Sequence, residues 1–327
     1  MEHAKKLFPN GLPTLEELKA FNAGKDVPPE TAWIWGENDE LGRINLLTPE
    51  VTQAAKESEL KDGTVVSLNW TVKYPEKPSF HRPAFQHKIA QHPLSPCIFD
   101  DYYDMNTQSG SQWDGFRHFG HLGLNRLYNN LKPEEVLSST RCGIQAISQH
   151  GIAGRGVLLD HYSWAKKQGR PYDPVSGHAI PVSELLEVAK AQNVEFRPGD
   201  ILLIRSGYVS RYYELQKENP AKLEELSHNE CFAGVEQSEE MKKFLHDNYF
   251  AAVGGDAPAF EAWPRKADYF LHEYLLALWG CLIGEMFDLE KLSEECEKRQ
   301  RWTFFFTSAP FNTPGGIASL ANALAIF

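Results

Sequence analysis

The sequence predicts an α/β fold, because short apolar runs alternate with stretches of helical periodicity through its second half. Residues 156–160 read Gly-Val-Leu-Leu-Asp, an apolar strand that ends in a carboxylate. Residues 197–207 begin with a Pro-Gly turn and continue into a buried strand, Ile-Leu-Leu-Ile. Between these two strands, the apolar side chains of residues 181–192 recur at helical spacing. Strands and helices mixed in one chain give the α/β class.

The chain is expected to form an N-terminal arm followed by one domain. Residues 1–30 are rich in proline and charge and are predicted to be an arm with one short helix near residues 14–21. The remainder, residues 31–327, is expected to be a single domain, since no internal repeat or low-complexity linker divides it.

The other elements are predicted from similar signals. Thr48 is a suitable N-cap for a helix that runs to about Leu60, with Pro49 at its first position. Residues 73–103 are rich in proline and histidine and are expected to be irregular. The remaining strands are expected over residues 65–72, 250–256 and 302–307, and the remaining helices over residues 221–226, 236–245 and 269–278.

The charge of the chain disfavours nucleic acid and anionic membranes as partners. Its 33 basic and 44 acidic side chains give a net charge of −11, so there is no basic excess to release counterions from a polyanion. The sequence contains no run of about 18 apolar residues, so no transmembrane helix is predicted. We therefore expect a protein that binds neither nucleic acid nor membrane.

The cysteines and the N-terminal residues predict a cytoplasmic location. The five cysteines are dispersed and form no Cys-x-x-Cys pair, which is typical of reduced thiols. The first residues, Met-Glu-His-Ala-Lys-Lys-Leu-Phe, lack the apolar stretch of a signal peptide.

Residues 106–121 are the most polar stretch of the chain and the first candidate for a functional site. Gln108, Gln112 and Asp114 fall on alternate positions, so they would share one face of an extended strand. Gln108 and Gln112 would then lie about 13 Å apart, too far to meet on one ion. Joint ligation therefore needs a bend, which Gly110 would allow. A polar loop whose amides satisfy neighbouring backbone groups would carry the same residues.

Two further pairs of polar residues are candidates. His118 and His121 are three residues apart and would be neighbours on a helix, although a chance structural pair fits equally in a chain with 12 histidines. His272 and Glu285 bound an apolar stretch in which two glycines indicate a helix that gives way to a strand. If Glu285 points inward it needs a metal or a hydrogen-bonding set as a partner, and otherwise it faces water.

These segments, in this order, resemble the cyclase family, whose relatives include bacterial kynurenine formamidases and isatin hydrolases. The resemblance spans nearly the whole chain and implies a single domain of the swivelling β/β/α type. It also implies a homo-oligomer, dimer or tetramer, that hydrolyses an amide or lactam of small molecules with metal-activated water. It rests on residues 35–49, 155–160, 197–207, 255–258, 272–276 and Glu285.

The chain departs from the family at its motif. The family motif is His-x-Gly-Thr-His-x-Asp-x-Pro-x-His, and here the residues from Gln108 to His118 read Gln-Ser-Gly-Ser-Gln-Trp-Asp-Gly-Phe-Arg-His. Two amides thus replace two imidazoles. Because an amide oxygen is a hard ligand, this change favours Mn²⁺ over Zn²⁺. The metal site that the resemblance implies consists of Gln108, Gln112, Asp114, His272 and Glu285.

Three functions remain compatible with these residues. The first is a metal-dependent hydrolase, and the second is a metal-free cyclase or lyase that uses His118 as general acid or base, positioned by a carboxylate. The third is an inactive relative that binds a small molecule. In the first two, His118 and Asp114 are the catalytic candidates. Candidates for substrate contact lie beside the motif, where aromatic rings can stack on a flat ligand or simply belong to the core: Trp113, Phe116, Arg117 and His121.

Overall fold

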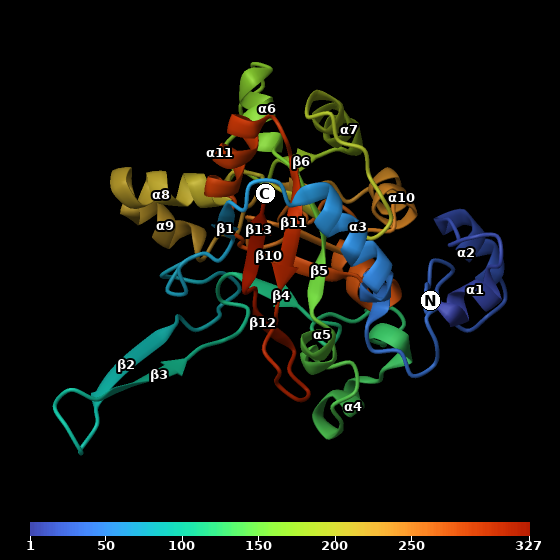
Figure 1. Cartoon of the computed structure of the whole chain (residues 1–327), viewed down its shortest axis with the longest axis horizontal. Helices are drawn as coiled ribbons and strands as arrows, with labels where there is room; N and C mark the ends of the chain where they lie inside the picture. The colour runs from blue at the N-terminus through green and yellow to red at the C-terminus, as the bar shows by residue number, and fades with distance from the viewer.

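A computed structural model describes all residues, 1–327, and a nine-stranded mixed sheet forms its centre (Figure 1). The four central strands β5, β7, β9 and β10 run parallel, and antiparallel strands extend the sheet on both sides. The central strands are buried along most of their length, as expected for parallel strands covered on both faces. In sheet order the strands are β1 (Val65–Ser67), β13 (Ala323–Ile326), β11 (Thr303–Ser308), β5 (Ile152–Leu159), β7 (Ile201–Ile204), β9 (Ala252–Gly255), β10 (Leu282–Glu285), β4 (Gln112–Asp114) and β12 (Ala318–Leu320).

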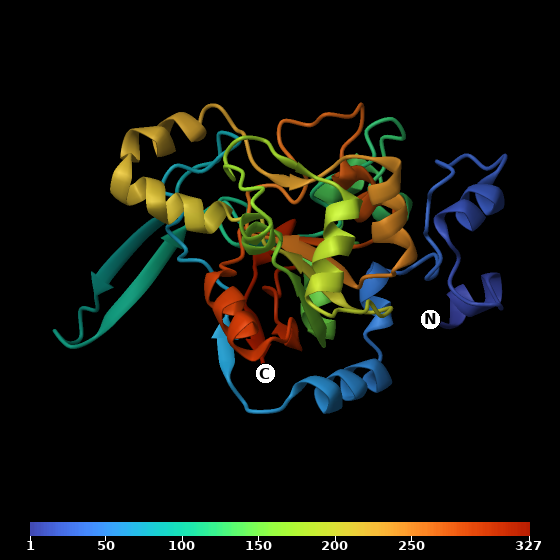
Figure 2. The ribbon, with the colours of Figure 1, turned by 90° about the horizontal axis from the view of Figure 1, so that it is seen from above.

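Helices surround this sheet, as Figures 1 and 2 show, so the α/β prediction is confirmed. The Thr48 side chain accepts a hydrogen bond from Val51 N at 3.4 Å and caps α3, as predicted. No helix is both long and apolar enough to cross a membrane. The helices are α1 (Glu2–Leu7), α2 (Leu15–Asn22), α3 (Pro49–Glu59), α4 (Pro133–Ser138), α5 (Ile144–His150), α6 (His161–Lys167), α7 (Val182–Ala191), α8 (Tyr208–Glu218), α9 (Pro220–Leu226), α10 (Glu239–Asp247) and α11 (Glu290–Arg299), with short turns η1 (Gly42–Leu46) and η2 (Tyr128–Asn130).

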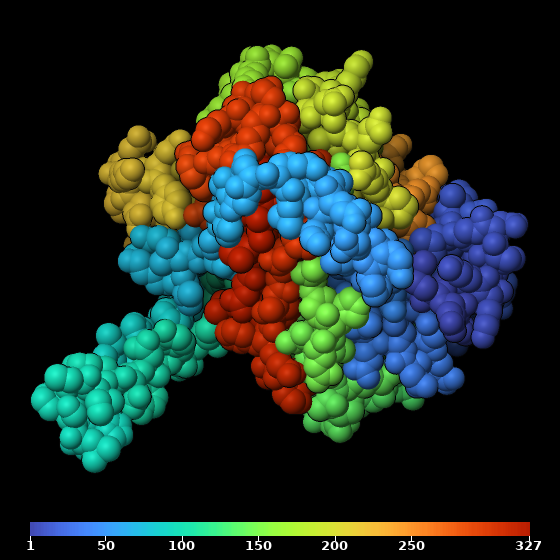
Figure 3. Space-filling view, in the orientation of Figure 1, coloured from blue at the N-terminus to red at the C-terminus, as the bar shows by residue number.

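The prediction of irregular structure over residues 73–103 is wrong for much of that segment. Strands β2 (Gln86–Gln91) and β3 (Phe99–Asp104) pair in a hairpin that projects from the body of the molecule (Figures 1 and 3). Almost every side chain of the hairpin is exposed, so its strands lack the alternation of apolar and polar residues that identifies a half-buried strand. The edge strand β12, strand β13 and helix α8 were also not predicted.

The segment predicted as a helix over residues 269–278 is a π-helical turn, η3 (Glu273–Leu278), which begins next to His272. The backbone at the end of this turn lies against η1. Arg43 N donates to Gly280 O at 2.7 Å, and a Cβ on Gly42 would lie 2.1 Å from that oxygen. Glycine at position 42 therefore permits the contact that holds η3, and with it His272, against the rest of the domain.

Candidate active site

Strand β4 places Gln112 and Asp114 on the same face of the sheet as Glu285. In the antiparallel pairing of β4 with β10, Gln112 lies directly opposite Glu285. Gln112 Nε2 donates to Glu285 Oε2 at 2.8 Å and to Asp114 Oδ1 at 3.3 Å. All three side chains are almost completely buried, so the register of two strands brings two carboxylates and one amide together away from water.

Gln108 reaches the same carboxylate because the chain turns just before β4. The turn is closed by Asn106, whose side-chain oxygen accepts a hydrogen bond from Gln108 N at 2.8 Å. Gln108 Nε2 then donates to Asp114 Oδ1 at 3.2 Å and also contacts His118 Nδ1. The bend that brings Gln108 and Gln112 together is therefore present. In this structure both side chains donate to the same oxygen, Asp114 Oδ1.

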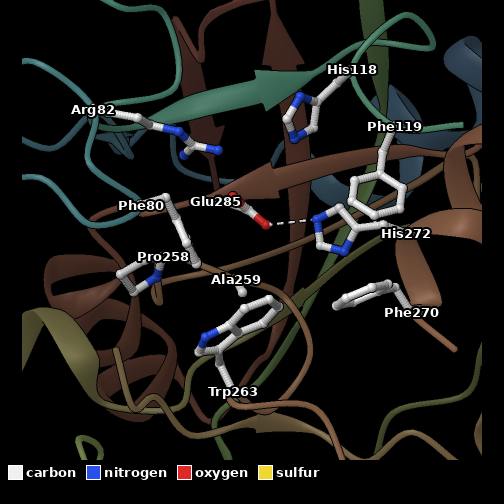
Figure 4. A pocket seen from close by; sticks show the side chains of 10 residues that line it. All are labelled: Phe80, Arg82, His118, Phe119, Pro258, Ala259, Trp263, Phe270, His272 and Glu285. Carbon is white, nitrogen blue, oxygen red and sulfur yellow. Dashed lines mark hydrogen bonds and ion pairs between the residues drawn. The ribbon is translucent and has the colours of Figure 1, made fainter. Parts of the chain in front are cut away.

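His272 is fixed by two carboxylates. Its Nδ1 lies 2.7 Å from Glu261 Oε1, and its Nε2 lies 3.2 Å from Glu285 Oε1 (Figure 4). Glu261 is fully buried and also accepts from the backbone nitrogens of Leu271 and His272 at 2.9 and 3.1 Å. The Glu261 side chain therefore orients the His272 ring so that Nε2 points at Glu285.

The ionisation of these groups follows from burial and from their neighbours. Burial opposes a charge on His272, but the hydrogen bonds to Glu261 and Glu285 outweigh it and raise the pKa of His272 well above its ordinary value. Burial and the charge of Asp114 raise the pKa of Glu285. Burial lowers the pKa of His118, which favours the neutral imidazole.

A cavity of about 210 Å³ opens onto this cluster (Figure 4). One side of the cavity is polar and is formed by His118, His272, Glu285 and the guanidinium of Arg82. Aromatic rings provide much of the remaining wall, and the rings of Trp263 and Phe270 are stacked, with centroids 5.7 Å apart and planes at 17°. The cavity is lined by Phe80, Arg82, His118, Phe119, Pro258, Ala259, Trp263, Phe270, His272 and Glu285.

The cluster fits a divalent cation. One ligand atom from each of Asp114, His272 and Glu285 lies within 4.8 Å of the other two. Asp114 Oδ2 and Gln112 Oε1 are buried and have no hydrogen-bond partner within the chain. Buried oxygens without a partner are costly, so these atoms are available to a cation. A donor set of mostly oxygen atoms with one imidazole suits a hard ion.

None of the four predicted substrate contacts lines the cavity. Trp113 lies on the other face of β4 and packs edge-on against Phe287 at 5.1 Å, with its indole nitrogen donating to Ser308 Oγ at 2.9 Å. The other three belong to the core or to loops elsewhere: Phe116 packs on Tyr128, Arg117 Nη2 donates to Ser139 O, and His121 Nδ1 accepts from Leu124 N. These four side chains therefore lie outside the wall of the cavity.

The site residues that sequence reasoning missed come from two separate segments. Phe80 and Arg82 precede the hairpin and line the cavity, whereas Trp263 and Phe270, which line it too, and Glu261, which contacts His272, follow β9. No motif or spacing links these segments in the sequence. The one signal in the sequence for Glu261 was its position shortly after residues 255–258, a segment on which the resemblance to the cyclase family rests.

Comparisons with known proteins place this geometry in context. A family model described as "putative cyclase" matches residues 66–262. None of the curated proteins compared with the chain matches it. Among solved structures, the chain is similar to one described as a novel cyclase, with 27% identity and a TM-score of 0.79 over 90% of this chain and 98% of that one.

Two isatin hydrolases are similar in fold. One, bound to the product analogue thioisatinate, has 12% identity and a TM-score of 0.57 over 86% of this chain and 99% of that one. The other, isatin hydrolase A from Ralstonia solanacearum, has 15% identity and a TM-score of 0.56 over 85% and 97%. These likenesses confirm the fold that the resemblance in the sequence implies.

Replacing Trp113 tests its assignment to the core. We expect Trp113→Phe to lower the free energy of unfolding by about 1–3 kcal/mol, because it removes a buried hydrogen bond and leaves a void. Urea unfolding measures this loss. The same change at the cavity wall, Trp263→Phe, is the matched control and should alter ligand affinity with less effect on stability. If Trp113→Phe leaves the stability unchanged and alters ligand affinity, Trp113 contacts the ligand and its assignment to the core is wrong.

Proposed function

The chain belongs to the putative cyclase family, and from that membership we propose that it is a hydrolase of small cyclic or aromatic amides, lactams or lactones. The observation that carries the proposal is His118, which lies at an aromatic cavity beside two buried carboxylates. A proton donor, a proton acceptor and a flat binding surface are the parts that such a hydrolysis requires.

The hydrogen bonds of His118 support its proposed role as general acid. Gln108 Nε2 donates to Asp114 Oδ1, so the amide group that contacts His118 Nδ1 is the NH₂. His118 Nδ1 must then accept, and in the neutral ring Nε2 carries the proton. Nε2 lies 3.8 Å from Asp114 Oδ2, and the ring lines the cavity. His118 can therefore give this proton to the nitrogen or oxygen that leaves.

The carboxylates complete the proton balance. As water adds to the carbonyl carbon, one water proton passes to Glu285, which lines the cavity and whose pKa is raised by burial and by the charge of Asp114. The C–N or C–O bond breaks, and His118 protonates the leaving atom. The proton on Glu285 then returns to His118, which restores the starting state. Water is consumed, and one carboxylic acid and one amine or alcohol are formed.

A divalent cation would be held by Asp114, His272 and Glu285, with Gln112 Oε1 as a further oxygen donor. When bound, it lowers the pKa of water and polarises the carbonyl. Since these donors are mostly oxygen, we propose Mn²⁺ in preference to Zn²⁺.

The cavity supports a flat substrate with a developing negative charge. The aromatic walls would stack on a ring of the substrate. Arg82 Nη1 donates to Gln108 O at 2.6 Å, which holds the guanidinium at the edge of the cavity, where a product carboxylate would be attracted.

A second candidate function is a metal-independent cyclase or lyase that uses His118. It is favoured by Gln112 Nε2, which donates to both carboxylates and thereby stabilises their charges without a cation. A third candidate, an inactive binding protein, would keep the aromatic cavity but show no turnover. The experiments below separate the three.

The hairpin supports a homo-oligomer. Ile89 and Phe99 are 62% and 59% exposed, and the strand register places them on one face of the hairpin. An isolated two-stranded hairpin is marginally stable in water, and exposed apolar clusters mark interfaces. We therefore propose that this face packs on a second copy of the chain, and that the protein works in the cytoplasm as a dimer or tetramer.

Replacing His118 tests the general acid. We expect His118→Ala to lower turnover at least about a hundredfold against a panel of aromatic amides, lactams and lactones, isatin included. The matched control is His121→Ala, because His121 lies nearby in sequence but not at the cavity, and its turnover should stay near that of the unaltered chain. Equal turnover in both variants would remove His118 from the mechanism.

Removing metal separates the first two functions. Protein dialysed against a chelator should lose hydrolysis and regain it with Mn²⁺ more fully than with Zn²⁺, because the donors are mostly oxygen. Elemental analysis and turnover are measured before and after. Full turnover in metal-free protein would leave the metal-independent enzyme, and no turnover with any ion would leave the binding protein.

Altering the hairpin tests the oligomer. Light scattering should give the mass of an oligomer for the unaltered chain and a smaller mass for the double variant Ile89→Ser, Phe99→Ser, because the apolar contact is lost. Leu137→Ser is the control, since Leu137 is 94% exposed but lies on α4. A monomeric unaltered chain would contradict the proposal.

A further inference from the structure

A second cluster of potential ligands lies away from the cavity. We propose that His161, His178 and Glu184 form a binding site for Zn²⁺ or a similar borderline divalent cation. One ligand atom from each residue lies within 4.8 Å of the other two. His161 begins α6, His178 precedes strand β6 (Ala179–Ile180), and Glu184 is in α7, so the site would join three segments. It does not depend on the function proposed for the cavity.

The hydrogen bonds of His161 point to a cation. His161 is fully buried, and its Nδ1 lies 3.1 Å from the hydroxyl oxygen of Tyr172. That hydroxyl donates its one proton to Ser206 O at 2.9 Å, so it must accept from Nδ1. In the neutral ring, Nε2 then carries only a lone pair.

This lone pair faces a carboxylate. His161 Nε2 lies 2.7 Å from Glu184 Oε2, and two acceptors at that distance need a positive charge between them. A proton is one way to supply it. A metal cation satisfies both atoms and leaves the imidazole neutral.

His178 contributes the third ligand. Its Nε2 atom is buried and has no hydrogen-bond partner within the chain. The ring is held by stacking on Tyr172, with centroids 4.1 Å apart and planes at 13°. A buried ring nitrogen without a partner, next to a lone pair and a carboxylate, is the second independent sign of a cation.

The type of ligand selects the metal. Two imidazoles and one carboxylate are typical of Zn²⁺, with water as a fourth ligand, and they disfavour Mg²⁺ and Ca²⁺. Arg170 Nη1 donates to the other carboxylate oxygen, Glu184 Oε1, at 3.1 Å and leaves Oε2 facing His161. The bound ion would fasten residues 168–178, which have no regular structure, to α6 and α7.

The test measures zinc binding to the full chain after chelation and dialysis. We use elemental analysis, titration with Zn²⁺ and the absorption spectrum of bound Co²⁺. Two variants remove single ligands: His178→Phe keeps a ring on Tyr172, and Glu184→Gln keeps the size of the side chain. Loss of a residue that only hydrogen-bonds to a metal ligand weakens metal affinity roughly 10–100-fold, so loss of a ligand itself should weaken zinc affinity by more than that. Each variant should also lose the rise in melting temperature that zinc causes in the unaltered chain.

Two controls make the result specific. His228→Phe changes an exposed histidine and should bind zinc like the unaltered chain. Glu285→Gln removes a ligand of the cavity and should keep this zinc equivalent and its Co²⁺ spectrum. The proposal is overturned if the unaltered chain binds no zinc. It is also overturned if the His178→Phe and Glu184→Gln proteins, shown by circular dichroism to be folded, bind as much zinc as the unaltered chain and bind it as tightly.

Discussion

The candidate active site depends on the burial of three carboxylates around one imidazole. Removing a carboxylate from water costs several kcal/mol unless a partner compensates, and Asp114, Glu261 and Glu285 are all nearly inaccessible. His272 touches two of them and lies 3.9 Å from the third. The β4–β10 register, the π-helical turn and the backbone donors at Leu271 and His272 therefore act together, because each keeps one of these charges stabilised.

Gln108 and Gln112, which stand where the cyclase resemblance leads one to expect imidazoles, are compatible with that constraint in a specific way. An imidazole that ligates a metal offers a lone pair, whereas Gln108 and Gln112 offer NH₂ groups to Asp114 and Glu285. The amides thus stabilise the carboxylates in part, and they reduce the charge that a cation has to balance. The amide of Gln108 also fixes His118 in one tautomer. Compared with imidazoles, the two amides offer a cation weaker ligands, but that of Gln108 holds His118 with its proton on Nε2, where it is available for transfer.

Local signals in the sequence predicted much of the fold, and tertiary contacts account for what it did not. Thr48 identifies the start of α3, and the apolar runs identify β5, β7 and β9, because caps and buried strands have local signatures. Arg82 and the aromatic walls reach the cavity from loops, and Glu261 likewise reaches His272 from outside the regular strands and helices, so no period predicts them. Trp113 was misjudged although strand alternation alone places it opposite to Gln112 and Asp114.

The two clusters differ in the donors that they present, and this difference predicts which ion each prefers. The cavity cluster offers two carboxylates, one imidazole and an amide oxygen, whereas the cluster on α6 and α7 offers two imidazoles and one carboxylate. Hard ions gain most from oxygen donors and borderline ions from nitrogen donors. If both proposals hold, the donors of the cavity cluster favour Mn²⁺ and those of the cluster on α6 and α7 favour Zn²⁺. The ion on α6 and α7 would then stabilise the fold, because it joins three segments of the chain.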